Sequence, residues 1–86
     1  MDSKRIILEL LDEQYSPYVQ VQLTSRLVSD LGIDSLDMSN IMADIALIFG
    51  ITPSAREFQT AYGIDPTVSQ LVEYVRVKQL KRPRQS

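Results

Sequence analysis

The 86-residue sequence contains no cysteine and no histidine. Without cysteine the chain has no disulfides, no thiolate ligands for zinc or iron–sulfur clusters and no cysteine nucleophile. Without histidine it lacks the commonest general base and the commonest transition-metal ligand, and a serine triad cannot be assembled from its own residues. We therefore expect a fold that rests on its hydrophobic core, with no metal site and no catalytic activity of its own.

Long hydrophobic runs are also missing, since no apolar segment approaches the roughly 20 residues that a membrane helix needs. Residues 1–5 lack the basic segment followed by an apolar stretch that marks a secretory signal. Apolar residues make up 44% of the chain and charged residues 23%, a balance typical of globular chains. One small, soluble domain is the expectation, located in the cytoplasm and not inserted in a membrane.

Charge is distributed unevenly along the chain. Residues 1–75 contain all eleven acidic residues and four basic ones, a net charge of −7, whereas residues 76–86 contain five basic residues and no acid. An acidic body disfavours nucleic acid as a partner because phosphate contacts need basic groups. We expect a folded domain over residues 1–78, a basic, disordered tail over residues 79–86, and no nucleic-acid partner.

The first predicted helix begins with Ser3 as its N-cap and ends near Gln14, before the Ser16-Pro17 pair, because proline disfavours helical geometry in the residue before it. A long connection over residues 16–33 follows. No partner strand exists for its alternating apolar residues, so we predict that they are loop anchors packed on a helical core. These are Val19, Val21 and Leu23.

The second predicted helix begins at Asp34 or Ser35 and runs to Phe49. Asp34 is a typical N-cap with an acid three residues on at Asp37, and Gly50 follows the last helical residue. Both ends of this helix therefore have clear signals.

Two further helices complete the prediction. Thr52 is expected to cap a third, shorter helix with Pro53 at its first position, which ends by Tyr62-Gly63. Thr67 is expected to cap the last helix. Its apolar stripe comprises Val68, Leu71, Val72 and Val75. The predicted fold class is all-α, a small antiparallel four-helix bundle with a long loop between helices one and two.

A helical wheel of residues 35–49 separates two apolar stripes. The stripe assigned to the core contains Met38, Ile41, Met42, Ile45, Ile48 and Phe49. The opposite stripe contains Leu36, Ala43 and Leu47, flanked by Asp37, Ser39, Asn40 and Asp44. The wheel alone leaves two interpretations of the second stripe, which are additional core and an exposed contact patch beside acids.

Ser35 is placed at the start of this helix, where unpaired amides and the macrodipole favour an attached anion such as a phosphodiester. The simpler interpretation is that Ser35 or Asp34 only caps the helix. Because no histidine can activate the Ser35 hydroxyl, covalent chemistry there would have to be performed by another enzyme.

The motif around Ser35, residues 30–37 with the sequence DLGIDSLD, resembles the attachment motif of the acyl carrier protein family. The resemblance extends over most of the chain, from an apolar first helix and a long loop to a short helix after Pro53 and a last helix that opens at Thr67. It implies that a phosphopantetheinyl transferase uses coenzyme A and magnesium to attach 4'-phosphopantetheine to Ser35. The thiol of this arm then carries acyl groups as thioesters.

The resemblance further implies that Leu36 and the acids of the second helix meet basic surfaces of partner enzymes, and that the carried chain can enter a cleft among the helices. Together with the second stripe, the expected partner-recognition residues are Asp34, Leu36, Asp37, Asn40, Ala43, Asp44 and Leu47. The expected partners are the transferase and the acyl-loading, condensing and modifying enzymes of the pathway, and the expected state is a monomer.

Three positions depart from the pattern of primary fatty acid synthesis. Asn40, Ala46 and Leu47 stand where that group typically has glutamates, so the face is less acidic and more apolar. This favours a dedicated pathway of fatty acyl, polyketide or related biosynthesis. Two alternatives stay open, which are a peptidyl or aminoacyl carrier of a nonribosomal pathway and an unmodified interaction module with the same fold.

Overall fold

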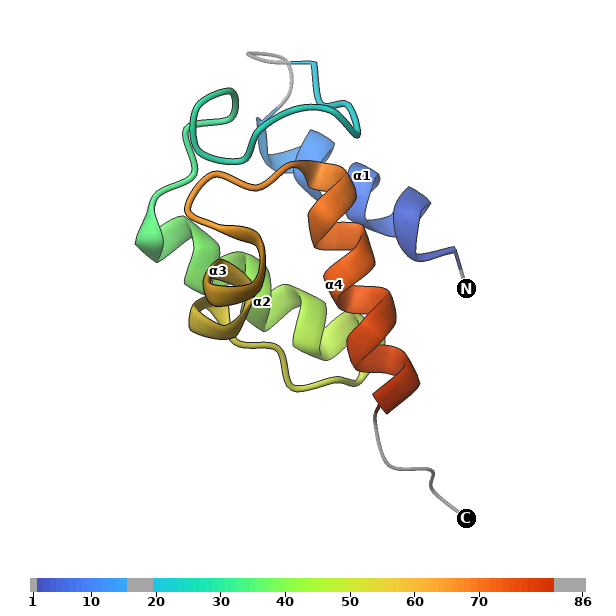
Figure 1. Ribbon diagram of the computed structural model, residues 1–86. Helices are drawn as coiled ribbons and strands as arrows, with labels where there is room; N and C mark the ends of the chain where they lie inside the picture. The colour runs from blue at the N-terminus through green and yellow to red at the C-terminus, as the bar shows by residue number, and fades with distance from the viewer. Residues whose placement is uncertain (1, 16–19, 82–86) are drawn as a thin grey trace.

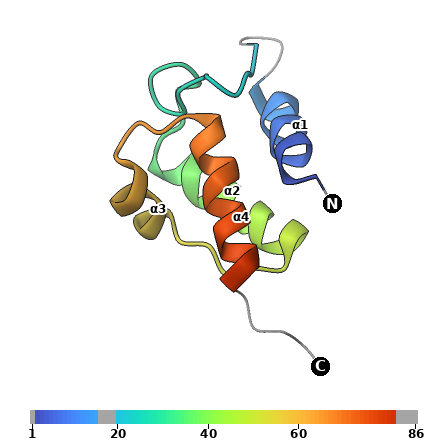
Figure 2. The same cartoon turned by 45° about the vertical axis from the view of Figure 1, so that its right-hand side comes forward.

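A computed structural model describes residues 2–15 and 20–81 of the chain, and four α-helices lie in these ranges. They are α1 (Ser3–Tyr15), α2 (Ser35–Phe49), α3 (Ala55–Tyr62) and α4 (Val68–Lys81). The connection from residue 20 to α2 runs across one end of the helices (Figure 1). α4 packs against both α1 and α3, between which it lies in Figure 2, and α3 also packs against α2. The predicted small all-α four-helix bundle is confirmed.

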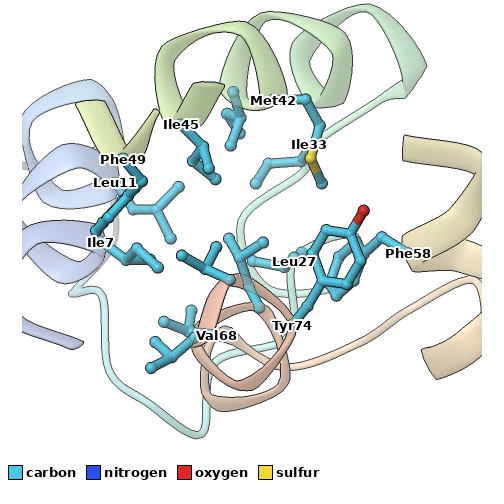
Figure 3. Packing of buried hydrophobic residues seen from close by; sticks show 14 of the residues in the cluster. Ile7, Leu11, Leu27, Ile33, Met42, Ile45, Phe49, Phe58, Val68 and Tyr74 are labelled. Atoms are coloured by element: carbon cyan, nitrogen blue, oxygen red, sulfur yellow. The ribbon is translucent and has the colours of Figure 1, made fainter. Parts of the chain in front are cut away.

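The core draws on all four helices and on the connection between α1 and α2 (Figure 3). Ile7 of α1, Ile45 of α2 and Phe58 of α3 are buried in it, together with Leu27 of the connection. Val21 and Leu23 are half-buried against this cluster, as predicted for loop anchors. Val19 and the Ser16-Pro17 pair lie outside the described residues. The remaining connection holds no strand in its described part, only an isolated bridge between Arg26 and Thr67.

The predicted ends of α2 and the predicted N-cap of α4 are confirmed. Asp34 is the N-cap of α2, and Gly50 adopts a left-handed conformation (φ 65°) while its N–H donates to the carbonyl of Ala46 at 3.0 Å. The hydroxyl of Thr67 accepts from the N–H of Gln70 at 3.2 Å and so caps α4.

The predicted start of α3 is wrong. The helix begins two residues after Pro53, at Ala55, and Ser54 is its N-cap, whose hydroxyl accepts from the N–H of Glu57 at 3.2 Å. Thr52 and Ser54 both have side chains suited to capping. A tertiary contact favours Ser54, because its N–H donates to the phenol oxygen of Tyr74 at 2.9 Å.

Both termini also differ from expectation. Ser3 is the first residue of α1 and not its cap, since the carboxylate of Asp2 accepts from the N–H of Arg5 at 3.4 Å. Ser3 is buried, and its hydroxyl donates to Gln79 of α4 at 3.0 Å. α4 continues to Lys81, three residues past residue 78, where the folded domain is expected to end. Residues 82–86 of the expected tail lie outside the described range.

Candidate functional site

The segment before Ser35 is anchored on both sides of a glycine. Leu31 and Ile33 are buried, whereas Gly32 between them is exposed and has a positive φ of 71°, which favours glycine. The N–H of Ile33 donates to the carbonyl of Leu27 at 3.0 Å, and Leu27 is itself fully buried. The apolar residues of the DLGIDSLD motif therefore fix the direction in which the chain enters α2.

Asp65 fastens this segment to the start of α4. Its carboxylate accepts from the N–H groups of Val28 and Ser29 at 3.0 and 3.1 Å and from the Ser29 hydroxyl at 2.7 Å. The hydrogen bond from the Ser29 hydroxyl is the main cause that lowers the pKa of Asp65. Sequence reasoning did not single out Asp65, although an Asp-Pro pair is a turn signal that could have drawn attention to it.

Ser35 is exposed and occupies the first position of α2. It lies between Asp34 and Asp37, which form a capping box at this end of the helix. The Asp34 carboxylate accepts from the N–H of Asp37 at 2.8 Å, and the Asp37 carboxylate accepts from the N–H of Asp34 at 3.4 Å. Asp34 thus performs the capping, and the Ser35 hydroxyl makes no hydrogen bond to any described residue. A phosphodiester on this oxygen would sit at the positive end of the helix dipole without breaking an existing contact.

The charge around this turn is negative. Tyr15, at the end of α1, is half-buried, and burial together with the charges of Asp37 and Asp34 raises its pKa. The end of α1 therefore lies within electrostatic range of the Ser35 turn. Because its pKa is raised above the ordinary value of 10.0, Tyr15 is a neutral neighbour of Asp34 and Asp37 at physiological pH.

A cavity of about 340 Å³ adjoins Ser35 between α2 and α3. Its lining from α2 includes Ser35, Met38 and Ser39, and its lining from α3 includes Ala55, Phe58 and Gln59. Ser35 thus lies on the wall of a partly apolar space.

The α3 side of this cavity is held by Tyr74 of α4. Its phenol donates to the carboxylate of Glu57 at 2.6 Å and to the carbonyl of Ser54 at 3.3 Å. Burial and the hydrogen bond to Glu57 raise the pKa of Tyr74 to about 12. Lys78 adds an ion pair to Glu57 at 3.0 Å. Sequence spacing gives no direct signal for such contacts between helices.

The second apolar stripe of α2 is exposed. Leu36 is 70% exposed and Leu47 is 86% exposed, and Ala43 between them is exposed as well. Asp37 and Asp44 are half-exposed along the same stripe, and Asp34 and Asn40 are exposed. The structure thus places all the expected partner-recognition residues on or next to one open face.

One residue assigned to the core stripe does not belong there. Ile48 is 40% exposed, whereas Ile41, Met42, Ile45 and Phe49 are buried and Met38 is half-buried. The reason is that Ile48 lines an open hollow between α1 and α2, where neither helix covers this edge of α2.

No group of three metal-ligating side chains lies together within residues 2–15 and 20–81. In the same part of the chain, every helix is too short or too polar to cross a bilayer.

Comparison with known families gives one clear result. Residues 5–75 match the family described as the phosphopantetheine attachment site, a stretch that includes all of α2 and α3 and the turn at Ser35. No curated protein matches the sequence significantly. Members of this family carry 4'-phosphopantetheine covalently. The chain therefore belongs to the phosphopantetheine attachment site family and is a phosphopantetheine-carrying acyl or peptidyl carrier protein.

Proposed function

We propose that Ser35 is the residue to which the 4'-phosphopantetheine arm is attached, and that the protein carries acyl groups as thioesters on it. The observation that supports this assignment best is the exposed Ser35 hydroxyl at the first position of α2, free of hydrogen bonds to the described residues. Asp34 and Asp37 cap the helix in its place. The hydroxyl is therefore available for chemistry without loss of the helix start.

The bound arm supplies the thiol on which an acyl group is held. The chain itself supplies a fixed origin for that arm, because buried Leu31 and Ile33 hold the turn that precedes Ser35. The adjoining cavity between α2 and α3 gives the attached group a space beside the helix bundle. We propose no catalytic role for the chain, since it contains no histidine that could act as a base on Ser35.

The open face of α2 is proposed as the surface that meets the transferase and the acyl-loading, condensing and modifying enzymes. Its acids, Asp34, Asp37 and Asp44, suit basic partner surfaces, and exposed Leu36 and Leu47 add apolar contacts. Because this face has few acids for its length, we place the protein in a dedicated fatty acyl, polyketide or related pathway. An aminoacyl cargo would identify the nonribosomal alternative.

The test is a modification reaction with a broad-specificity phosphopantetheinyl transferase and coenzyme A, followed by intact mass. The wild type should gain one phosphopantetheine and Ser35→Ala none. Ser39→Ala is the matched control, since Ser39 is also exposed on α2 and also lines the cavity. It should be modified like the wild type. Modification of Ser35→Ala, or an unmodified wild type with every transferase tried, would contradict the assignment.

A further inference from the structure

A second hollow lies between α1 and α2, toward the end of α2 that is remote from Ser35. Its volume is about 480 Å³, and its lining comprises Leu10, Glu13 and Gln14 of α1 and Asp44, Leu47 and Ile48 of α2. Each helix contributes residues at i, i+3 and i+4, which places each triplet on one face of its helix. α1 packs mainly against α4, and the hollow between α1 and α2 is open.

The hollow combines apolar and acidic groups. Leu47 is 86% exposed, Ile48 is 40% exposed and Leu10 is half-buried, so an apolar side chain placed there would remove all three from water.

The two acids of the hollow, Glu13 and Asp44, form no ion pair with any described residue. The amide of Gln14 donates to the Asp44 carboxylate at 3.4 Å and links the two helices across the hollow. With no basic residue in its lining, the hollow is complementary to an apolar side chain that has a cation beside it.

A second copy of the chain offers similar chemistry. Leu80, near the end of α4, is 86% exposed and lies close to Lys78 and Lys81. A contact between this end and the hollow would join different patches of the two copies, so it would close only as a ring or a reciprocal pair and would otherwise extend into a fibre. A separate partner protein can occupy the hollow one to one.

We propose that the α1–α2 hollow is a docking site for a partner protein that inserts an apolar side chain flanked by Lys or Arg. The proposal rests on the proposed function, since the partner would be an enzyme that acts on the group carried at Ser35. Leu47 is twelve residues beyond Ser35, or about 18 Å along the helix. A partner bound in the hollow would therefore be held at a point well separated from Ser35, where the carried group is attached.

The contribution of α1 gives this site an orienting role. Contacts with α2 alone form a single line, about which a partner can rotate. Glu13 and Leu10 provide a second wall on another helix, and contacts with both walls fix the rotation of the partner about the α2 axis. The partner's active site is then directed toward the Ser35 turn.

The test uses two synthetic helical peptides of equal length as probes. Both have leucines at helical spacing, flanked by lysines in one peptide and by glutamates in the other. Each is titrated into the ¹⁵N-labelled protein and followed by NMR. The lysine peptide should shift the amide signals of residues 10–14 and 44–48, and the glutamate peptide should not.

Matched variants locate the binding. Leu47→Ser should weaken the lysine peptide about tenfold, whereas Leu80→Ser should not, although both leucines are 86% exposed in the wild type. Glu13→Gln should also weaken it, and Glu73→Gln, which removes one charge from an exposed residue of α4, should leave it unchanged. Ser35→Ala should bind like the wild type, so that failure of modification at Ser35 and failure of docking are observed separately.

Three results would overturn the proposal. One is no binding of the lysine peptide, or shifts away from the hollow. Another is that Leu47→Ser and Glu13→Gln weaken binding of the lysine peptide no more than their controls Leu80→Ser and Glu73→Gln do. That result would indicate unspecific attraction of the peptide to an acidic protein. The third is concentration-dependent self-association in sedimentation that Leu80→Ser abolishes, which would make a second copy the occupant.

Discussion

Asp34 and Asp37 cap each other's backbone across Ser35. Each carboxylate accepts the N–H of the other residue, at 2.8 Å for the bond from Asp37 and 3.4 Å for the bond from Asp34. The helix start is therefore independent of the Ser35 side chain. This separation of roles allows Ser35 to be modified or mutated while α2 keeps its N-terminus.

Asp34→Ala should lower the free energy of unfolding by about 1 kcal/mol, because the N-cap acceptor is lost. Ser35→Ala should change it by less than about 0.5 kcal/mol, the usual range for an exposed position. Urea denaturation of the two variants and the wild type provides the measurement. A Ser35→Ala variant as unstable as Asp34→Ala would show that the serine contributes to the cap after all.

Two substitutions on α2 distinguish its faces. Leu47 is 86% exposed, so Leu47→Glu should melt close to the wild type. Ile45 is fully buried, so Ile45→Glu should destabilise the fold by about 3 kcal/mol or more through an unpaired buried carboxylate. Thermal melts compare them directly. If Leu47→Glu unfolds as readily as Ile45→Glu, the open face is part of the core.

Tyr74→Phe keeps the ring in the core and removes the hydrogen bonds to Glu57 and Ser54. It should destabilise the protein by about 1 to 2 kcal/mol at neutral pH, because a hydrogen bond to a charged acceptor is lost. Amide hydrogen exchange should rise most in α3.

The difference in stability between the wild type and Tyr74→Phe should depend on pH in one direction. The pKa of Tyr74 is raised from 10.0 to about 12 in the fold, so the unfolded chain loses this proton first. The stability that Tyr74 adds over Phe is complete below pH 10 and should decline as pH rises toward 12. A constant difference between wild type and Tyr74→Phe across that range would contradict the assigned hydrogen bond.

Asp65→Asn tests the link between the loop and α4. Folding lowers the pKa of Asp65 from its ordinary value of 3.8, chiefly through the Ser29 hydroxyl. Its contribution is therefore present above pH 3.8 and is lost as pH falls through the lower folded pKa. Urea denaturation at a series of pH values should show the wild type exceeding Asp65→Asn at pH 7 and the difference shrinking in acid. A gap that widens in acid would contradict this account.

The sequence predicts α2 and its caps well because the signals are local. Asp34, Asp37 and Gly50 act on backbone groups within four residues of themselves, and each does what its residue type suggests. The buried stripe of α4 likewise follows from spacing alone.

The features that sequence reasoning missed depend on contacts between distant segments. From the sequence alone, Thr52 and Ser54 are equally suitable as N-caps of α3. The choice depends on Tyr74, twenty residues further along the chain, whose phenol oxygen accepts from the N–H of Ser54. Ile48 fits the core stripe of a wheel, but whether that edge is covered depends on where α1 packs. For the same reason the exposure of Leu47 could not be decided from the wheel.

The most direct test of the central claim is mass spectrometry of the protein purified from its native host. Trypsin cleavage after Arg26 and Arg56 gives a peptide of residues 27–56, which contains Ser29, Ser35, Ser39 and Ser54, so fragmentation must assign the modified residue. We expect 4'-phosphopantetheine on Ser35, with any acyl cargo on its thiol. An arm on another serine, or a chain that never bears one, would contradict it.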